Sequence, residues 1–260
     1  MYNFDFEKPS SVADAVAALA DEDAQALGGG QTLIPTLKQR LASPSKLVSL
    51  TGIADIQGVS SDGGQVSIGG ATCHADVAAN AGAYPALAAL AGNIGDPAVR
   101  ARGTIGGSLG NNDPSACYPA AALGSGATLV TNAREIAADD YFQGMFTTAL
   151  DDGEIITAVN FPVPEAANYQ KFEQPASRFA LVGVFVAKYA DGVRVAVTGA
   201  SEEGVFRWSA AEDALSGDFS ADAVPAAPDA EGMIGDMHGT SAYRAHLVAV
   251  LTKRAVAACG

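Results

Sequence analysis

The stretch Thr104-Ile105-Gly106-Gly107-Ser108-Leu109-Gly110-Asn111-Asn112-Asp113-Pro114 decides how the rest of the chain is interpreted. It places three glycines, two amides, an acid and a proline within eleven residues. Such a polar, glycine-dense run favours neither a core strand nor a helix, and it is typical of a backbone that approaches another group closely. A similar run, Leu27-Gly28-Gly29-Gly30-Gln31-Thr32-Leu33, lies upstream, so in chain order it is the first run and the stretch 104–114 is the second run. We expect the two runs to form two walls of one site for a phosphate-bearing cofactor.

The first run, Gly28-Gly29-Gly30, lies between a predicted strand and a predicted helix. Successive backbone N–H groups in a tight turn can point inward together and bind a diphosphate, and glycines leave room for its approach. The chain contains neither GxGxxG nor GxxxxGK followed by Ser or Thr, which argues against an ordinary Rossmann or P-loop site. A purely structural role stays open for both runs: a plain turn for the first, and a bulge or close strand crossing for Gly106-Gly107.

Composition limits the classes of function. With 260 residues, 48% hydrophobic and 17% charged, the chain is expected to be soluble and to bury a full core. Its formal net charge of −14 argues against nucleic-acid binding, because phosphate contacts need clustered Lys and Arg. No apolar run approaches the roughly 18–20 residues of a membrane span, and the N-terminus lacks signal-peptide features. We therefore expect a cytoplasmic protein.

The cysteines and histidines show no metal-ligand spacing. Cys73, Cys117 and Cys259 are scattered, and no CxxC pair occurs. We therefore expect neither an iron–sulfur cluster nor a zinc site in this chain. No side chain has the context of a catalytic acid, base or nucleophile. His74 is a candidate for a position near the cofactor, with a structural role at a helix start as the alternative.

The residue pattern predicts three sections. Helices at 11–22 and 32–41 and strands at 24–27 and 46–50 form a small α/β unit over about 1–52. The section 53–163 is expected to hold a hairpin of 56–60 with 65–70, helices at 75–81, 86–91 and 116–123, and strands at 127–131 and 154–161. Pro162 and Pro164 mark the main domain boundary. The domain 164–260 is expected to open with the segment 169–173 and to hold strands at 180–189, 193–200 and 205–208 and a helix at 242–257.

Two longer motifs resemble those of a known family. Gly28-Gly29-Gly30-Gln31-Thr32-Leu33-Ile34-Pro35-Thr36-Leu37-Lys38 and Arg100-Ala101-Arg102-Gly103-Thr104-Ile105-Gly106-Gly107-Ser108-Leu109 are similar to the two FAD motifs of the medium subunit of molybdenum hydroxylases. That family includes the carbon monoxide dehydrogenase, aldehyde oxidoreductase and xanthine dehydrogenase types. Asn112-Asp113-Pro114 and Tyr118-Pro119 continue the match, and Ser177-Arg178-Phe179-Ala180-Leu181-Val182-Gly183-Val184 extends it toward the C-terminus. The resemblance covers essentially the whole chain.

The resemblance implies an α+β fold. Its FAD-binding domain, about 1–163, would be of the vanillyl-alcohol-oxidase (PCMH) type in two subdomains, about 1–52 and 53–163. A C-terminal domain, 164–260, would follow with a three-stranded antiparallel sheet and a helix bundle. The sections predicted from the residue pattern agree with this division.

The resemblance also implies cofactor-binding residues. The first run would line the pyrophosphate and ribityl side, and the second would form another cradle with the Thr104 and Ser108 hydroxyls donating to phosphate oxygens. Ile94 matches a position that contacts adenine, Ile156 one beside the flavin ring, and Lys171 a polar contact near the isoalloxazine. The full implied set is Gly28, Gly29, Gly30, Gln31, Thr32, Leu33, Ile94, Thr104, Ile105, Gly106, Gly107, Ser108, Asn112, Asp113, Ile156 and Lys171. Cys117 departs from the pattern, since relatives often carry Asp there.

The implied function is that of a non-covalent FAD subunit in a heteromeric molybdenum hydroxylase. Molybdopterin would lie on a large partner subunit and two-iron clusters on a small one, in a dimer of heterotrimers. Electrons would pass from those clusters through FAD to an external acceptor. Two alternatives stay open: a stand-alone FAD oxidoreductase of the same fold, which would need its own substrate pocket and base, and a scaffold subunit without cofactor.

Overall fold

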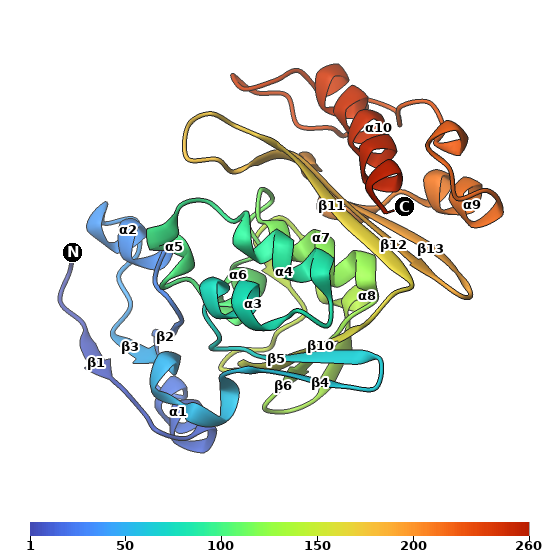
Figure 1. The fold of residues 1–260 in the computed structure, drawn as a ribbon. Helices are drawn as coiled ribbons and strands as arrows, with labels where there is room; N and C mark the ends of the chain where they lie inside the picture. Colours follow the sequence, from blue (N-terminus) through green and yellow to red (C-terminus); the bar gives the residue numbers. More distant parts are fainter. Residues whose placement is uncertain (260) are drawn as a thin grey trace.

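The computed structural model describes residues 1–259, which form three units in chain order (Figure 1). The first unit, blue in the figure, has a parallel sheet with strand order β1-β3-β2. Its strands are β1 (Asp5–Glu7), β2 (Ala24–Leu27) and β3 (Lys46–Ser49), and its helices are α1 (Val12–Leu19) and α2 (Leu33–Lys38). The Ser11 hydroxyl caps α1 by accepting the Asp14 N–H at 3.1 Å.

The second unit is built on an antiparallel sheet with strand order β4-β5-β10-β6-β7. The strands are β4 (Val59–Asp62), β5 (Gln65–Gly69), β6 (Thr128–Thr131), β7 (Glu135–Ala137) and β10 (Ile156–Pro162). The helices are α3 (His74–Asn80), α4 (Pro85–Gly92), α5 (Pro97–Arg100), α6 (Ile105–Asn111), α7 (Cys117–Ser125) and α8 (Ala138–Tyr141). A short hairpin joins β8 (Phe142–Gly144) to β9 (Thr147–Thr148), and the 3₁₀ turns Leu50–Gly52 and Ala54–Ile56 link this unit to the first.

The third unit has a four-stranded antiparallel sheet, β11-β12-β13-β14, where three strands were expected. Its elements are β11 (Ala166–Glu173), β12 (Ala180–Tyr189), β13 (Gly192–Ser201), β14 (Gly204–Arg207), α9 (Ser209–Gly217), a 3₁₀ turn (Ala221–Ala223) and α10 (Ser241–Ala258). The extra strand is β11, which pairs with β12 along its whole length. The expected helix bundle is also corrected, because α9 and α10 pack chiefly on the sheet.

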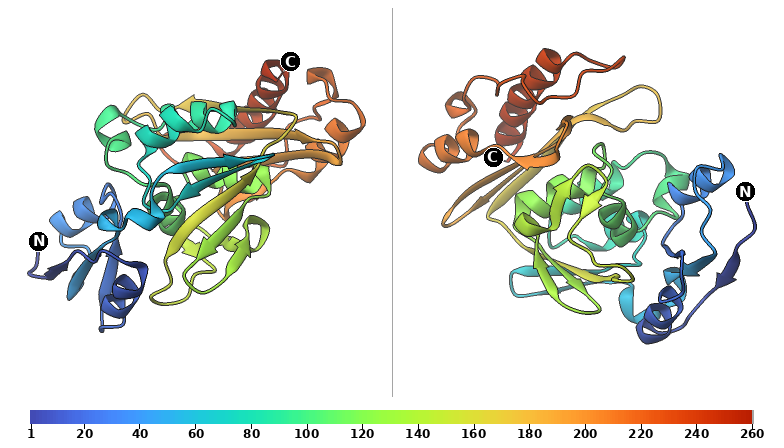
Figure 2. Two further views of the ribbon diagram at one scale, coloured as in Figure 1. Left: turned by 60° about the horizontal axis from the view of Figure 1, so that its bottom comes forward. Right: turned by 180° about the vertical axis from the view of Figure 1, so that it is seen from behind.

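This third sheet lies between two hydrophobic cores. Helix α10 covers one face, and α7 and α4 of the second unit cover the other (Figure 1). Side chains alternate between faces along β12, so Val184 and Val186 join the α10 core while Phe185 and Ala187 join the core around α7. The second and third units therefore share one continuous core, with the small first unit at the far end of the molecule (Figure 2).

The central stretch forms helix α6, although its composition favoured neither strand nor helix. Ile105 and Leu109, four residues apart, are fully buried and give α6 its apolar face. The Thr104 hydroxyl caps its start, and Asn112 ends it in the left-handed region with φ of +43°. Tertiary packing and capping at both ends thus override the weak helix propensity of the glycines.

None of the helices within residues 1–259 has both the length and the apolar character of a membrane-spanning segment.

Candidate functional site

A cavity of about 700 Å³ opens where the first unit meets α6 and the loop between β11 and β12. Most of the residues predicted to bind a cofactor line it: Gly28, Gly29, Gly30, Gln31, Thr32, Leu33, Ile94, Thr104, Gly106, Gly107, Ser108, Asp113 and Ile156. The two glycine runs, about 75 residues apart in sequence, are therefore brought to one site.

Three predicted residues lie outside the cavity lining. Ile105 is fully buried in the core beneath α6. Asn112 is 2% exposed, and its side-chain amide donates to the carbonyl oxygens of Gly144 and Thr147. The Lys171 ammonium is enclosed by protein and donates to Asn93 O at 2.6 Å. Each of the three supports the walls of the cavity from behind.

The first run offers unpaired backbone donors to the cavity. Among the described residues, no acceptor lies within hydrogen-bond range of the N–H groups of Gly29, Gly30, Gln31 or Thr32. The turn is fixed by its other groups: Gly30 O accepts from Ile34 N at 3.0 Å, and the Gln31 side chain donates to Gly29 O at 2.9 Å. Gly30 has a φ of +71°, which glycine adopts without strain. Four consecutive backbone donors without a protein partner, all on residues that line the cavity, are available to a phosphate group.

The second run differs, because its backbone donors already have partners. Ile105 N donates to Thr72 O, Gly106 N to Gly70 O, and Gly107 N to the Thr104 hydroxyl, at 2.9–3.1 Å. The second cradle that the resemblance implies therefore depends on side-chain hydroxyls and not on backbone donors. What this run can offer is hydroxyl groups: the Thr104 hydroxyl still has its own hydrogen to donate, and that of Ser108 has no protein partner within residues 1–259.

The two runs also pack directly on each other. A Cβ atom at Gly29 would lie 1.9 Å from the carbonyl oxygen of Arg102, and one at Gly28 would lie 2.7 Å from the Thr104 hydroxyl oxygen. Real Cβ atoms do not approach that closely, so a side chain at Gly29 would push the runs apart. The two runs are adjoining parts of one wall, not two facing walls.

His74 lies behind the second run at the start of α3 and lines the cavity. The side chain is 4% exposed, and its ring packs on Tyr118 with the centroids 5.3 Å apart. Burial lowers the pKa of His74 to about 4, so the imidazole is neutral at physiological pH. Its Nδ1 has no hydrogen-bond partner among the described residues. From the sequence, both a position near the cofactor and a structural role at a helix start were open for His74.

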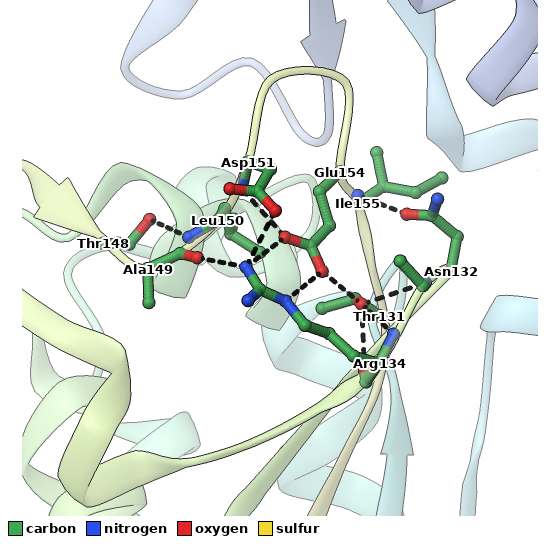
Figure 3. A network of polar contacts seen from close by, with 10 residues as sticks. Thr131, Asn132, Arg134, Thr148, Ala149, Leu150, Asp151, Glu154 and Ile155 are labelled. Carbon is green, nitrogen blue, oxygen red and sulfur yellow. Dashed lines mark hydrogen bonds and ion pairs between the residues drawn. The ribbon is translucent and has the colours of Figure 1, made fainter.

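Two acids line the cavity, and both are already engaged. Glu154 accepts from the Arg134 guanidinium at 3.0 Å and from the Thr131 hydroxyl at 2.6 Å (Figure 3). Chiefly because of the hydrogen bonds from Arg134, the pKa of Glu154 falls to about 2. Asp113 accepts the N–H of Ser115 at 2.8 Å in a local turn. Glu154 is therefore a paired carboxylate with little tendency to take a proton, and Asp113 is engaged in a local turn.

The loop between β11 and β12 adds lining residues that the site prediction missed. Ser177, Arg178 and Phe179 reach the cavity, and the only signal for them was their place in the resemblance. Lys171 donates to both Asn93 O and Arg178 O, so it ties this loop to the segment that carries Ile94. The resemblance assigned Lys171 and Ile94 to different rings of the cofactor, and in the structure the Lys171 ammonium contacts the residue that precedes Ile94.

The third unit anchors the segment that follows α6. The Thr198 hydroxyl donates to Pro114 O at 2.9 Å, and Gly199 N donates to the same oxygen at 2.7 Å. The buried guanidinium of Arg244 in turn holds Gly199 O at 2.7 Å. Cys117, at the end of this segment, is 6% exposed and lines the cavity. Burial raises the pKa of its thiol, so it cannot replace the carboxylate of an Asp.

Comparison with known proteins decides the family. Residues 2–164 match the family described as the FAD binding domain in molybdopterin dehydrogenase. This chain belongs to that family. The prediction of an FAD-binding medium subunit of the molybdenum hydroxylases is therefore confirmed, as is FAD as the cofactor of this chain.

Relatives of this family match along nearly the whole chain. The carbon monoxide dehydrogenase medium chain of Afipia carboxidovorans and the nicotine 6-hydroxylase medium subunit of Paenarthrobacter nicotinovorans are each 34% identical, over 98% of this chain and 96% of theirs. A solved structure of carbon monoxide dehydrogenase from Hydrogenophaga pseudoflava superposes with a TM-score of 0.88 at 30% identity, covering 99% of this chain and 97% of that one. These matches confirm the α+β fold class and an oxidoreductase subunit.

Proposed function

We propose that this chain is the FAD-carrying subunit of a heteromeric molybdenum hydroxylase, assembled with a large molybdopterin-binding subunit and a small subunit with two-iron clusters. The observation that carries the proposal is the row of four free backbone donors, Gly29 to Thr32, in a cavity lined by both family motifs. When bound, FAD supplies the relay that takes electrons from the partner's clusters and passes them to an external acceptor. A dimer of such heterotrimers is the proposed assembly.

Different residues of the chain bind different parts of FAD. The N–H groups of Gly29 to Thr32 hold the pyrophosphate by hydrogen bonds that need no side-chain charge, which suits a protein of net charge −14. The hydroxyls of Thr104 and Ser108 donate to phosphate oxygens from the adjoining part of the wall. Ile94 and Ile156 offer apolar surface to the cofactor rings. Gly28, Leu33, Gly106, Gly107 and Asp113 complete the lining, while Ile105, Asn112 and Lys171 fix its shape.

The geometry favours an electron-relay subunit over a stand-alone oxidoreductase. An enzyme acting on its own substrate needs a base that is free to take a proton. Of the titratable groups at this cavity, Glu154 is held by Arg134, Asp113 by a local turn, and His74 has a strongly lowered pKa. We place the complex in the cytoplasm, since Cys73, Cys117 and Cys259 are all free thiols, as in a reducing compartment.

Reconstitution tests cofactor binding. Apoprotein incubated with FAD should emerge from gel filtration yellow, with about one flavin per chain, and Gly107→Leu should emerge colourless because its side chain fills the space beside Thr104. A wild-type chain that gains no flavin absorbance would contradict the proposal.

Purification of the tagged chain from cells that also express the two partner subunits tests the assembly. Molybdenum and iron should co-purify with the flavin in stoichiometric amounts. A chain that turns over a substrate alone and captures neither metal would instead be a stand-alone oxidoreductase.

A further inference from the structure

Phe146 is an aromatic residue with a strained backbone conformation. It lies in the turn between β8 and β9 with a φ of +56°, a region that bulky side chains rarely adopt. Its side chain is 59% exposed, yet it lines the cavity. Glycine or asparagine would occupy this turn with less strain, and the ring contributes little to the core. Strain of this kind persists where the surrounding structure enforces it, and it often serves a function.

Asn112 enforces the conformation of this turn. Its carbonyl oxygen accepts the N–H of Phe146 at 3.0 Å, and its side-chain amide donates to Gly144 O at 2.8 Å and Thr147 O at 2.9 Å. Asn112 itself has a positive φ and is 2% exposed. On the far side the turn abuts Gly204, where an added Cβ would lie 3.4 Å from Gly144 C. The turn is therefore clamped from two sides.

The clamp holds Phe146 in the lining of the cavity. Leu150, which lies against Gly110 in the last turn of α6, and Phe179 line the same cavity. A dinucleotide with a pyrophosphate near its middle carries a planar ring system at each end. An apolar aromatic side chain held in the lining matches the face of such a ring.

We propose that Phe146 stacks on one of the two ring systems of the bound FAD, and that Asn112 is the positioning residue that holds it there. This inference rests on the proposed function, because it needs FAD in the cavity. A partner subunit covering the same turn is the competing occupant. The ligand is favoured because Phe146 lines the cavity whereas its exposed neighbour Met145 does not.

Titration of the apo chain with FAD, followed by fluorescence quenching, tests the stack. Phe146→Leu keeps an apolar side chain but loses the ring, so the dissociation constant should rise about tenfold. Phe146→Tyr keeps the ring and should bind within about twofold of wild type. Met145→Ala is the matched control and should bind like wild type. None of the three should lower the melting temperature of the apo chain, because both side chains are exposed.

The visible spectrum identifies the ring. If Phe146 stacks on the isoalloxazine, the flavin absorption bands of the saturated Phe146→Leu protein will be shifted from those of wild type. If it stacks on adenine, the affinity will fall while the bands stay in place. Either result supports the proposal.

The positioning role of Asn112 is tested by a double-mutant cycle. Asn112→Ala should weaken FAD binding in the wild-type background but add almost nothing in Phe146→Leu, while it lowers the melting temperature in both. A merely structural Asn112 would weaken binding equally in the two backgrounds. Wild-type protein that binds FAD and a Phe146→Leu variant of equal affinity would overturn the stacking proposal and leave the proposed function intact. Failure of wild type to bind FAD would instead remove the proposed function.

Discussion

The two glycine runs hold three glycines each and lie in contact, but their backbone N–H groups have different partners. In the first run the N–H groups of Gly29 to Thr32 point to no protein acceptor within residues 1–259. In the second run the N–H groups of Ile105 to Gly107 are all paired, with Thr72, Gly70 and the Thr104 hydroxyl. Glycine in the first run leaves donors open to a ligand, whereas glycine in the second lets the backbone of α6 pack closely on its neighbours.

A glycine-rich motif therefore does not by itself indicate a phosphate-binding backbone. In the second run, glycine is needed because the backbone lies against Gly70. The second run also packs against the first run and supports it. Its glycines are needed for packing, and its hydroxyl groups are what it can offer to a phosphate. Variants at the two runs can separate effects on packing from effects on FAD binding.

The largest effect is expected at the contact between the runs. Gly29→Ala would place a Cβ 1.9 Å from the Arg102 carbonyl oxygen, so the first unit must move away from the segment that leads into α6. We expect a loss of about 3 kcal/mol in the free energy of unfolding and no flavin retained on gel filtration. Gly82→Ala is the matched control, since nothing lies within 4 Å of its added Cβ. Normal stability and flavin content in Gly29→Ala would show that the runs are not in contact.

The next largest effect depends on pH and concerns His74, which packs behind the second run. His74 packs there in its neutral form with a pKa of about 4, below its ordinary value of 6.5. Between these values the unfolded chain binds a proton that the folded chain does not, so stability is full above pH 6.5 and falls toward pH 4. We expect a loss of about 3 kcal/mol over that window in denaturant titrations of the apo chain.

His74→Gln supplies the comparison, because it removes the titrating group. Its free energy of unfolding should change much less between pH 6.5 and 4. Parallel pH profiles for wild type and His74→Gln would mean that His74 is accessible to protons in the folded chain.

A smaller effect is expected at the start of α6. Thr104→Val keeps the shape of the side chain but removes the hydroxyl that accepts the Gly107 N–H. We expect a loss of about 1 kcal/mol in stability and weaker FAD binding, while Thr104→Ser, which keeps the hydroxyl, should stay close to wild type. If Thr104→Val matched wild type in thermal unfolding, the cap would contribute nothing to α6.

Much of the third unit could be predicted from sequence because its signals are local. Strand β12, Ala180–Tyr189, was predicted with both of its ends, and the Asp191-Gly192 turn fixed the hairpin with β13. Helix α10 begins and ends within one residue of its prediction. Helix α6 was missed because its helical state comes from burial of Ile105 and Leu109 and from its caps, not from local propensity.

The same distinction between local signals and tertiary contacts applies to the site. The residues of both runs were found because glycine density is visible in the sequence. Which donors are free could not be predicted, because the acceptors Gly70 and Thr72 lie more than thirty residues from α6 and reach it only through folding. The roles of Lys171, Asn112 and Phe146 were hidden for the same reason, since each depends on contacts with distant backbone.

Amide hydrogen exchange, read by NMR on the apo and FAD-saturated chain, tests the difference between the two runs most directly. The amides of Gly29 to Thr32 should exchange fast without FAD and become protected when it binds, while those of Ile105 to Gly107 should be protected in both states. Gly29 to Thr32 amides that stay fast in the FAD-saturated chain, or Ile105 to Gly107 amides that gain protection only with FAD, would contradict the assignment of the pyrophosphate to the first run.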